Sequence, residues 1–304
     1  MADAPPDMQQ VAVVGGGLIG TSWASLFCAS GYDVRVFDPS AEVRGQVKAM
    51  CTGQIKQLRA LGFTGNGTLT VTDSLEEAAG HADLVQENAP EKPDLKAELF
   101  ANLENITPAD AIFASSTSSL TWTDMVGAMK QPGRLIIAHP FNPPHLLPLV
   151  EIYGEDETVV SKAWAFYESL ERTPIRIRKP VAGHVANRLS SALFQEAVHM
   201  VLEGVATPED IDTALKSGPG LRWAALGVFL GYHLGGGQGG IEHYLKHLGP
   251  SQAKRWAELG RPTLDAAASN TLAQAVLDMV GDAPIEALEA ERDACLIAMQ
   301  AQTS

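Results

Sequence analysis

The stretch "VAVVGGGLIGTSWASLFCASG", residues 11–31, decides the fold of the amino-terminal half. A short apolar run is followed by glycines in the pattern Gly15-x-Gly17-x-x-Gly20 and then by a run that can form a helix. In a dinucleotide-binding strand–turn–helix unit, the first glycine permits the tight turn and the second lets the backbone approach the pyrophosphate. The third permits close packing of helix against strand. We therefore expect a dinucleotide site here.

The residues around this motif carry the remaining cofactor determinants. The backbone N–H groups of Leu18 and Ile19, at the start of the predicted helix, are expected to bind the phosphates. Asp38 ends the next apolar run, eighteen residues after Gly20, where its carboxylate would bind both ribose hydroxyls and repel the 2′-phosphate of NADP. The plainer alternative is a glycine-rich turn beside a surface aspartate, but motif, position and spacing agree. The predicted cofactor is NAD.

Short apolar runs alternate with helical stretches as far as about residue 178. Continuous rather than alternating hydrophobicity is typical of strands that helices cover on both faces, as in a parallel sheet. The runs lie at residues 11–14, 33–37, 69–72, 83–86, 111–114, 135–138 and 174–178. The last run, "PIRIR", alternates and is expected to be an edge strand.

Beyond residue 180 the strand pattern stops and helical periodicity replaces it. Apolar residues follow one helical stripe through 185–202, and further helical segments are expected near 241–260 and 284–300. The predicted fold is an α/β Rossmann-like N-terminal domain with a mostly parallel sheet, followed by an all-α C-terminal domain. We expect a disordered tail at 1–9, an NAD-binding domain at 10–180, and a helical domain for substrate binding and dimerisation at 181–304.

Composition limits the partners. The formal net charge of −14 and the pI near 4.9 argue against a nucleic-acid surface, and the most apolar stretch is too broken by glycines to span a membrane. Three widely spaced cysteines favour a reducing, cytoplasmic compartment over a disulfide framework. The helical half has more apolar positions than it can bury alone, so we expect a homodimer. Those positions include Leu221, Trp223, Val228, Phe229 and Leu230.

The segment "HPFNPPHLLPLVE", residues 139–151, combines an ionisable pair with four prolines that exclude a helix. A dehydrogenase that oxidises an alcohol must remove the hydroxyl proton, and histidine suits this role because its pKa lies near working pH. A carboxylate beside the ring would orient it and stabilise the imidazolium. Glu151 can do this for His139 if the prolines fold the segment back on itself. The residues alone leave a catalytic pair and a structural pair equally open.

Several ordered motifs resemble the 3-hydroxyacyl-CoA dehydrogenase superfamily over almost the whole chain. They are "GGGLIG", Asp38, "PEKPDLK", "SSTSSL", "HPFNP", "LVE" and "GHVANRL". The resemblance implies that His139 is the general base or acid and Glu151 its partner. It implies that Ser118 bonds the substrate oxygen, that Asn187 lies near the reacting carbonyl, and that Asn142 lies beside the nicotinamide. Cofactor contacts are implied for Glu91 and Lys96.

Within that superfamily, "GPGLRWAALG" resembles the short-chain branch that includes L-gulonate 3-dehydrogenase with λ-crystallin, and L-carnitine dehydrogenase. Arg222 then stands where it could clamp a substrate carboxylate. Trp223 could contact a quaternary ammonium or simply belong to the core. The chain departs from the branch at Phe229-Leu230-Gly231, where Phe-Glu-Thr is usual, which leaves the exact substrate open.

The predicted activity is therefore NAD-dependent oxidation of the 3-hydroxyl of a small L-3-hydroxy acid, of the gulonate or carnitine type. One alternative is an L-3-hydroxyacyl-CoA dehydrogenase. Another is a non-catalytic crystallin-like or dinucleotide-binding protein, which erosion of the site residues would favour; all are present. His243 and His247 have a spacing that can bind zinc, but no third ligand is evident, so no metal is predicted.

Overall fold

The computed structural model describes residues 8–301, and the chain divides into two compact units. The first unit comprises the residues up to Asn187 together with those from Glu286 onward, and the second is Arg188–Ile285. The expected domain boundary near residue 180 stays a prediction. Most of the expected disordered tail lies outside the described residues. Its last two residues have defined contacts: Met8 is buried in the core, and Gln9 N–H donates to Asp83 Oδ2 at 2.8 Å.

The first unit is built on a mostly parallel sheet, as the apolar runs predict. Its described strands are β1 (Gln10–Val14), β2 (Asp33–Phe37), β3 (Leu69–Thr72), β4 (Leu84–Glu87), β5 (Ile112–Ser115), β6 (Leu135–Pro140), β7 (Leu149–Tyr153) and β8 (Thr173–Arg176). They lie in the order β3-β2-β1-β4-β5-β6-β7-β8. All neighbours are parallel except β6 and β7. The last strand, β8, is an edge strand as predicted.

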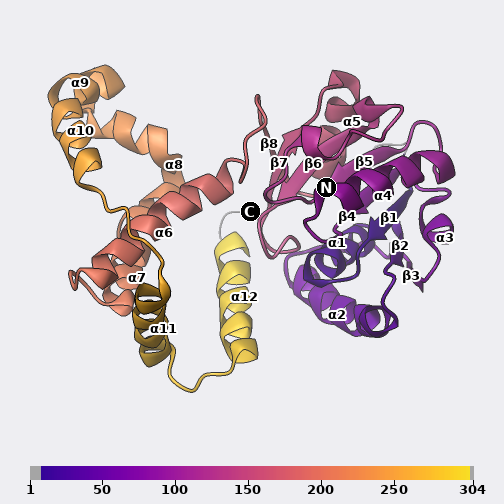
Figure 1. The fold of residues 1–304 in the computed structure, drawn as a ribbon, viewed down its shortest axis with the longest axis horizontal. Helices are drawn as coiled ribbons and strands as arrows, with labels where there is room; N and C mark the ends of the chain where they lie inside the picture. The colour runs from indigo at the N-terminus through magenta and orange to yellow at the C-terminus, as the bar shows by residue number, and fades with distance from the viewer. Residues whose placement is uncertain (1–7, 302–304) are drawn as a thin grey trace. The chain divides into compact units, whose positions relative to one another are not determined.

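Helices cover both faces of the sheet (Figure 1). They are α1 (Leu18–Ala29), α2 (Ala41–Ala60), α3 (Leu75–Ala79), α4 (Pro93–Ile106) and α5 (Glu157–Ser169), with short 3-10 turns η1 (Trp122–Asp124) and η2 (Pro132–Arg134). Alternate residues of β1 enter two separate cores. Val11 and Val13 pack with α1, α2 and α5, whereas Ala12 and Val14 pack with α3 and α4. This two-sided burial explains why the strand reads as a continuous apolar run.

The last helix, α12 (Ile285–Ala301), belongs almost entirely to the first unit. Gln57 of α2 donates from Nε2 to Asp293 Oδ2 at 2.9 Å. The same amide accepts, through Oε1, a hydrogen bond from His145 Nε2 at 2.7 Å, and Nδ1 of His145 lies 2.6 Å from Ser22 Oγ of α1. One chain of hydrogen bonds thus ties α12 to α2, to the proline-rich segment and to α1.

The second unit is helical, in agreement with the predicted fold class. It contains all but the first two residues of α6 (Ala186–Leu202), and α7 (Pro208–Ser217), α8 (Pro219–Gly235), η3 (Gly237–Gly239), α9 (Gly240–His247), α10 (Gly249–Glu258) and α11 (Ala266–Val280). Within residues 188–285, all of which are described, Val198 is the one buried hydrophobic side chain. Phe229 is 86% exposed and Leu221 66%. No helix in the described part of the chain is both long and apolar enough to cross a membrane.

Candidate active site

The site lies where the parallel strands end. Val14, Glu87 and Ser115, the last residues of β1, β4 and β5, are register neighbours, and β6 ends beside them. In open α/β sheets, ligands bind at these carboxyl ends. Because β7 runs antiparallel to β6, its first residues arrive at the same edge. The sheet therefore brings side chains from five strands to one place.

The glycine-rich turn has the geometry that the motif predicts. Gly15 has φ +96°, and a Cβ there would lie 2.7 Å from the carbonyl oxygen of Asn88. A Cβ at Gly20 would lie 1.8 Å from the carbonyl oxygen of Gly15, so helix α1 can approach the turn only through a glycine. Nothing lies within 4 Å of the Cβ position of Gly17, the residue before α1 begins. This open side, beside the free N–H groups of Leu18 and Ile19, fits a pyrophosphate.

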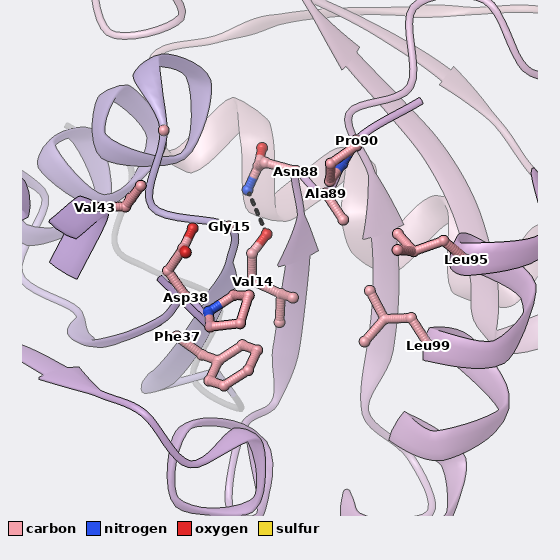
Figure 2. Close-up of a pocket in the computed structure, with 12 residues that line it drawn as sticks. Val14, Gly15, Phe37, Asp38, Val43, Asn88, Ala89, Pro90, Leu95 and Leu99 are labelled. Atoms are coloured by element: carbon pink, nitrogen blue, oxygen red, sulfur yellow. Dashed lines mark hydrogen bonds between the residues drawn. The ribbon is translucent and has the colours of Figure 1, made fainter. Parts of the chain in front are cut away.

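Asp38 connects the turn to the end of β2. Its Oδ2 accepts a hydrogen bond from Gly16 N–H and its Oδ1 accepts one from Ser40 N–H, both at 2.8 Å. The carboxylate is half-buried and forms part of the wall of a hollow (Figure 2). Its position agrees with the ribose-binding role predicted for it, which stays a prediction.

That hollow has a volume of about 470 Å³ and follows the glycine-rich turn. Figure 2 shows Leu95 and Leu99 of α4 on one side, with Phe37 and Val43 on the other. A slot between apolar side chains, with a carboxylate at its rim and a helix N-terminus beside it, suits a base, a ribose and a phosphate in turn. The residues present therefore fit a dinucleotide.

His139 and Glu151 form a buried pair across β6 and β7. They are register partners, and His139 Nδ1 lies 2.7 Å from Glu151 Oε2. The other carboxylate oxygen accepts hydrogen bonds from the N–H groups of Val185 at 2.8 Å and Ala186 at 3.0 Å. Burial acts to raise the pKa of Glu151, but the hydrogen bonds from His139, Ala186 and Val185 outweigh it and hold the pKa below its usual value. An ionised carboxylate only accepts, so Nδ1 carries the proton and Nε2 is free to act as a base.

Glu91 organises the segment that carries Ser118. Its Oε1 accepts hydrogen bonds from Thr117 Oγ1 at 2.6 Å, Ser118 N–H at 2.7 Å and Ser119 N–H at 2.8 Å. Burial acts to raise the pKa of Glu91, but these bonds and the ammonium of Lys96 bring it down to about 2. The hydroxyl of Ser118 is 3.4 Å from the same oxygen, and the residue is exposed. Ser118 can therefore turn towards a substrate.

Lys96 is enclosed, which the sequence does not indicate. Its side chain is 1% exposed, and its ammonium lies 2.6 Å from Glu87 Oε1, 3.1 Å from the Ala89 carbonyl oxygen and 3.5 Å from Glu91 Oε2. These three partners use its three donors. The predicted contact with the cofactor stays a prediction, but the burial suits Lys96 better to shaping the loop after β4.

The remaining predicted residues are scattered. Asn142 is exposed in the segment after β6, and Asn187 is the second residue of α6, directly after the N–H groups that bind Glu151.

Arg222 and Trp223 lie on α8 in the second unit, which is described by itself, so their roles stay predictions. His243 and His247 have ring centroids 4.2 Å apart, and the described residues contain no metal-binding group of three such side chains.

Residues 10–180 match the NAD binding domain of 3-hydroxyacyl-CoA dehydrogenase, and residues 183–269 match its C-terminal domain. The chain belongs to the 3-hydroxyacyl-CoA dehydrogenase family. Its Rossmann-like domain is thus an NAD-binding domain, which confirms the predicted cofactor.

Relatives within the 3-hydroxyacyl-CoA dehydrogenase family cover nearly the full chain. An L-carnitine dehydrogenase of Streptomyces griseus is 43% identical over 296 residues, 95% of this chain and 88% of the relative. Another, of Oceanobacillus iheyensis, is 38% identical, covering 95% and 96%. Among solved structures, the NAD+-dependent dismutase 5-formyl-3-hydroxy-2-methylpyridine 4-carboxylic acid 5-dehydrogenase superposes with a TM-score of 0.82 at 28% identity, covering 96% and 97%. The 3-hydroxybutyryl-CoA dehydrogenase of Escherichia coli K12 gives 0.60 at 29%, covering 70% and 47%.

Two buried residues of this family member were not predicted as part of the site. Glu87 binds Lys96, and it also accepts hydrogen bonds from Ala89 N–H and Ser115 Oγ, both at 2.6 Å. An acid directly after a run expected to form a buried strand is a signal that could have identified it. His184 contacts the ring of His139, and its place in "GHVANRL", three residues before Asn187, was the available clue.

Proposed function

We propose that this protein is an NAD-dependent dehydrogenase that oxidises the 3-hydroxyl of a small L-3-hydroxy carboxylic acid, with L-carnitine as the first candidate. The observation that carries the proposal is the buried His139–Glu151 pair at the carboxyl edge of an NAD-binding sheet. The similarity to proteins named L-carnitine dehydrogenase supports this substrate class.

In the proposed reaction, Nε2 of His139 accepts the proton of the substrate hydroxyl. NAD, when bound, supplies the acceptor for the hydride that leaves the same carbon. Glu151 holds the ring through Nδ1 and offsets the charge of the imidazolium, while its second oxygen is fixed by Val185 and Ala186. Ser118 and Asn187 would bind the substrate oxygen. The reverse reaction returns the proton from Nε2.

Arg222 is the proposed ligand of the substrate carboxylate. It is exposed, and none of the ion pairs found within residues 8–301 involves it. An arginine here could instead pair with an acid of the protein itself, such as Asp210 or Asp212. Asp210 instead accepts a hydrogen bond from Thr207 Oγ1 at 2.9 Å. An unpaired guanidinium favours an anionic substrate.

The test is NADH absorbance with a panel of L-carnitine, L-gulonate, L-3-hydroxybutyrate and 3-hydroxybutyryl-CoA. Highest kcat/KM with a free acid supports the proposal. Faster turnover of the CoA ester than of every free acid would favour the acyl-CoA alternative. NADH binding without turnover of any substrate would favour a non-catalytic dinucleotide-binding protein.

The proposed assembly is a homodimer in which a second copy covers the helical unit. A unit of this size with Val198 as its one buried hydrophobic side chain has no core of its own. Exposed apolar residues on α8, including Leu221, Phe229 and Leu230, would supply the interface. A cytoplasmic location is proposed from the free thiols of Cys28, Cys51 and Cys295.

A further inference from the structure

The turn that leads into α6 has an unusual backbone. Gly183 has φ +77° and His184 has φ +48°, so a residue with a full side chain adopts the left-handed conformation. Such residues are uncommon, and they persist where the surrounding structure holds them, often at functional sites. The next two N–H groups, of Val185 and Ala186, bind Glu151. The turn therefore holds the carboxylate of the His139–Glu151 pair in place.

The imidazole of His184 is buried, with only 2% of the residue exposed. Its Nε2 lies 2.9 Å from the carbonyl oxygen of Thr117. A carbonyl oxygen only accepts, so Nε2 carries the proton and donates it. Thr117 immediately precedes Ser118, and its hydroxyl donates to Glu91. The ring of His184 is thus hydrogen-bonded directly to the segment that carries Ser118.

The same ring contacts the catalytic histidine. The ring centroids of His184 and His139 are 4.9 Å apart, with 49° between the ring planes. The titratable groups that face His184 are His139 on β6, Glu151 on β7 and Glu91 in the loop after β4. Burial lowers the pKa of His184, which leaves it neutral near pH 7. A neutral neighbour adds no charge repulsion when His139 takes up a proton.

We propose that His184 is a positioning residue that holds the Ser118 segment at a fixed place relative to the ring of His139. This inference rests on the proposed function, in which Ser118 binds the oxygen whose proton His139 removes. The two groups come from different strands, β5 and β6. The ring of His184 packs against His139, and its Nε2–H donates to the carbonyl oxygen of Thr117, just before Ser118. His184 therefore links the two groups. It acts through Thr117 and His139 and need not touch the substrate.

Two substitutions of His184 show whether it positions the Ser118 segment through its hydrogen bond or only fills space beside His139. His184→Phe keeps a ring against His139 but removes the donor to Thr117. His184→Gln removes the ring but keeps an amide N–H that can reach the position of Nε2. His81 is exposed in the same unit, before β4, and His81→Phe is the matched control for the loss of a histidine. Steady-state kinetics, NADH affinity by fluorescence, and the melting temperature are measured for each.

We expect His184→Phe to lower kcat on the order of tenfold to a hundredfold, the cost of a misplaced reacting group, while KM and NADH affinity change little. We expect His184→Gln to stay within about threefold of the wild type. Wild-type kcat in His184→Phe would overturn the proposal. So would equal losses in both variants accompanied by lost NADH binding, because that pattern indicates damaged folding.

A second measurement does not depend on the substrate. In His184→Phe, hydrogen–deuterium exchange should rise in the peptide that contains Thr117 and Ser118, and in His184→Gln it should not. If the wild type oxidises no substrate of the panel, the proposed function fails. The exchange comparison still tests whether the hydrogen bond from His184 to Thr117 holds the Ser118 segment in place. Unchanged exchange in His184→Phe would overturn the positioning role even in an active enzyme.

Discussion

Nδ1 of His139 lies 2.7 Å from Oε2 of Glu151, and the two residues also face each other as register partners on antiparallel strands. The distance between them is thus set twice, once by a hydrogen bond and once by the backbone ladder. An acid–base pair held in this way loses little freedom when substrate binds, because its geometry already exists.

Loss of either member of this pair should affect chemistry more than cofactor binding. We expect His139→Ala to lower kcat by about 10²–10⁴ and to leave the affinity for NAD nearly unchanged. Glu151→Gln should lower kcat and shift the pH–rate profile, since the imidazolium loses its anionic partner. Stopped-flow NADH formation and fluorescence titration measure the two effects. Near-wild-type turnover in either variant would show that the pair is not catalytic.

Asp38 should determine the preference for NAD over NADP. Its carboxylate accepts hydrogen bonds from the N–H groups of Gly16 and Ser40, so an alanine would disturb the turn as well as the predicted ribose contact. Asp38→Asn keeps an acceptor and removes the charge. We expect it to weaken NADH binding by about tenfold to a hundredfold, the loss of hydrogen bonds to a charged group, and to improve NADPH binding. Equal use of both cofactors by the wild type would contradict this assignment.

Arg222 should discriminate between free acids and thioesters. We expect Arg222→Ala to raise KM for a carboxylate substrate by about tenfold or more, the loss of a charge-assisted hydrogen bond. Arg222→Lys should restore it only in part, since lysine lacks the two-pronged geometry. KM for 3-hydroxybutyryl-CoA serves as the control and should move little. An equal rise for both substrates would indicate that Arg222 has a structural role.

His145 should make stability depend on pH. Burial lowers its pKa from 6.5 to about 4, an effect that Asp293 opposes and that Arg172 and Arg292 reinforce. Between these two values the unfolded chain binds a proton that the folded chain does not, so the free energy of unfolding falls as the pH is lowered through this window. By pH 5 the loss should be about 2 kcal/mol.

Urea unfolding at pH 7 and pH 5 measures that loss, and His145→Gln should reduce it. Some dependence should remain in the variant, because burial also lowers the pKa of His184. Glu91 acts at lower pH: its pKa of about 2 lies below the usual 4.5, so its contribution is lost only as the pH falls through that range. An identical pH slope in the wild type and His145→Gln would exclude the predicted role of His145.

The homodimer should be visible as a mass of twice the 32.3 kDa chain by light scattering at micromolar protein. Phe229, 86% exposed in the single chain, tests the interface. We expect Phe229→Asp to shift the protein towards a monomer and to lower its melting temperature. In a monomeric protein the same change would replace an exposed apolar side chain and cost almost nothing. A wild-type mass near 32 kDa at all concentrations would contradict the dimer.

The sequence predicts the sheet well because buried parallel strands leave continuous apolar runs. Strand β7 was not predicted as a strand, since Pro143, Pro144 and Pro148 obscure the start of "LVEIY" and only "LVE" was recognised, as a motif. The predicted helical segments also leave out α11, although its alanine-rich sequence favours a helix. For β7 the local pattern is poor and tertiary packing decides the structure.

Some residues of the site can be predicted from the local sequence and others cannot. Glycine spacing and the acid after β2 identify the cofactor turn because they act locally. The enclosure of Lys96 by Glu87 and the contact of His184 with His139 depend on loops that meet only in the folded chain. A sequence motif can include such residues, but it does not show which side chains are buried and which face the bound ligand.

The antiparallel register of β6 and β7 limits which insertions and deletions leave the His139–Glu151 pair intact. His139 and Glu151 are twelve residues apart, but most of that interval is loop, which can change length without moving either side chain. A single residue added inside β7 ahead of Glu151 would instead turn the carboxylate to the opposite face of the sheet. A change in loop length should therefore leave the pair in register, although it would disturb the contacts of His145 with α1 and α2, whereas a change of one residue within β7 should abolish activity.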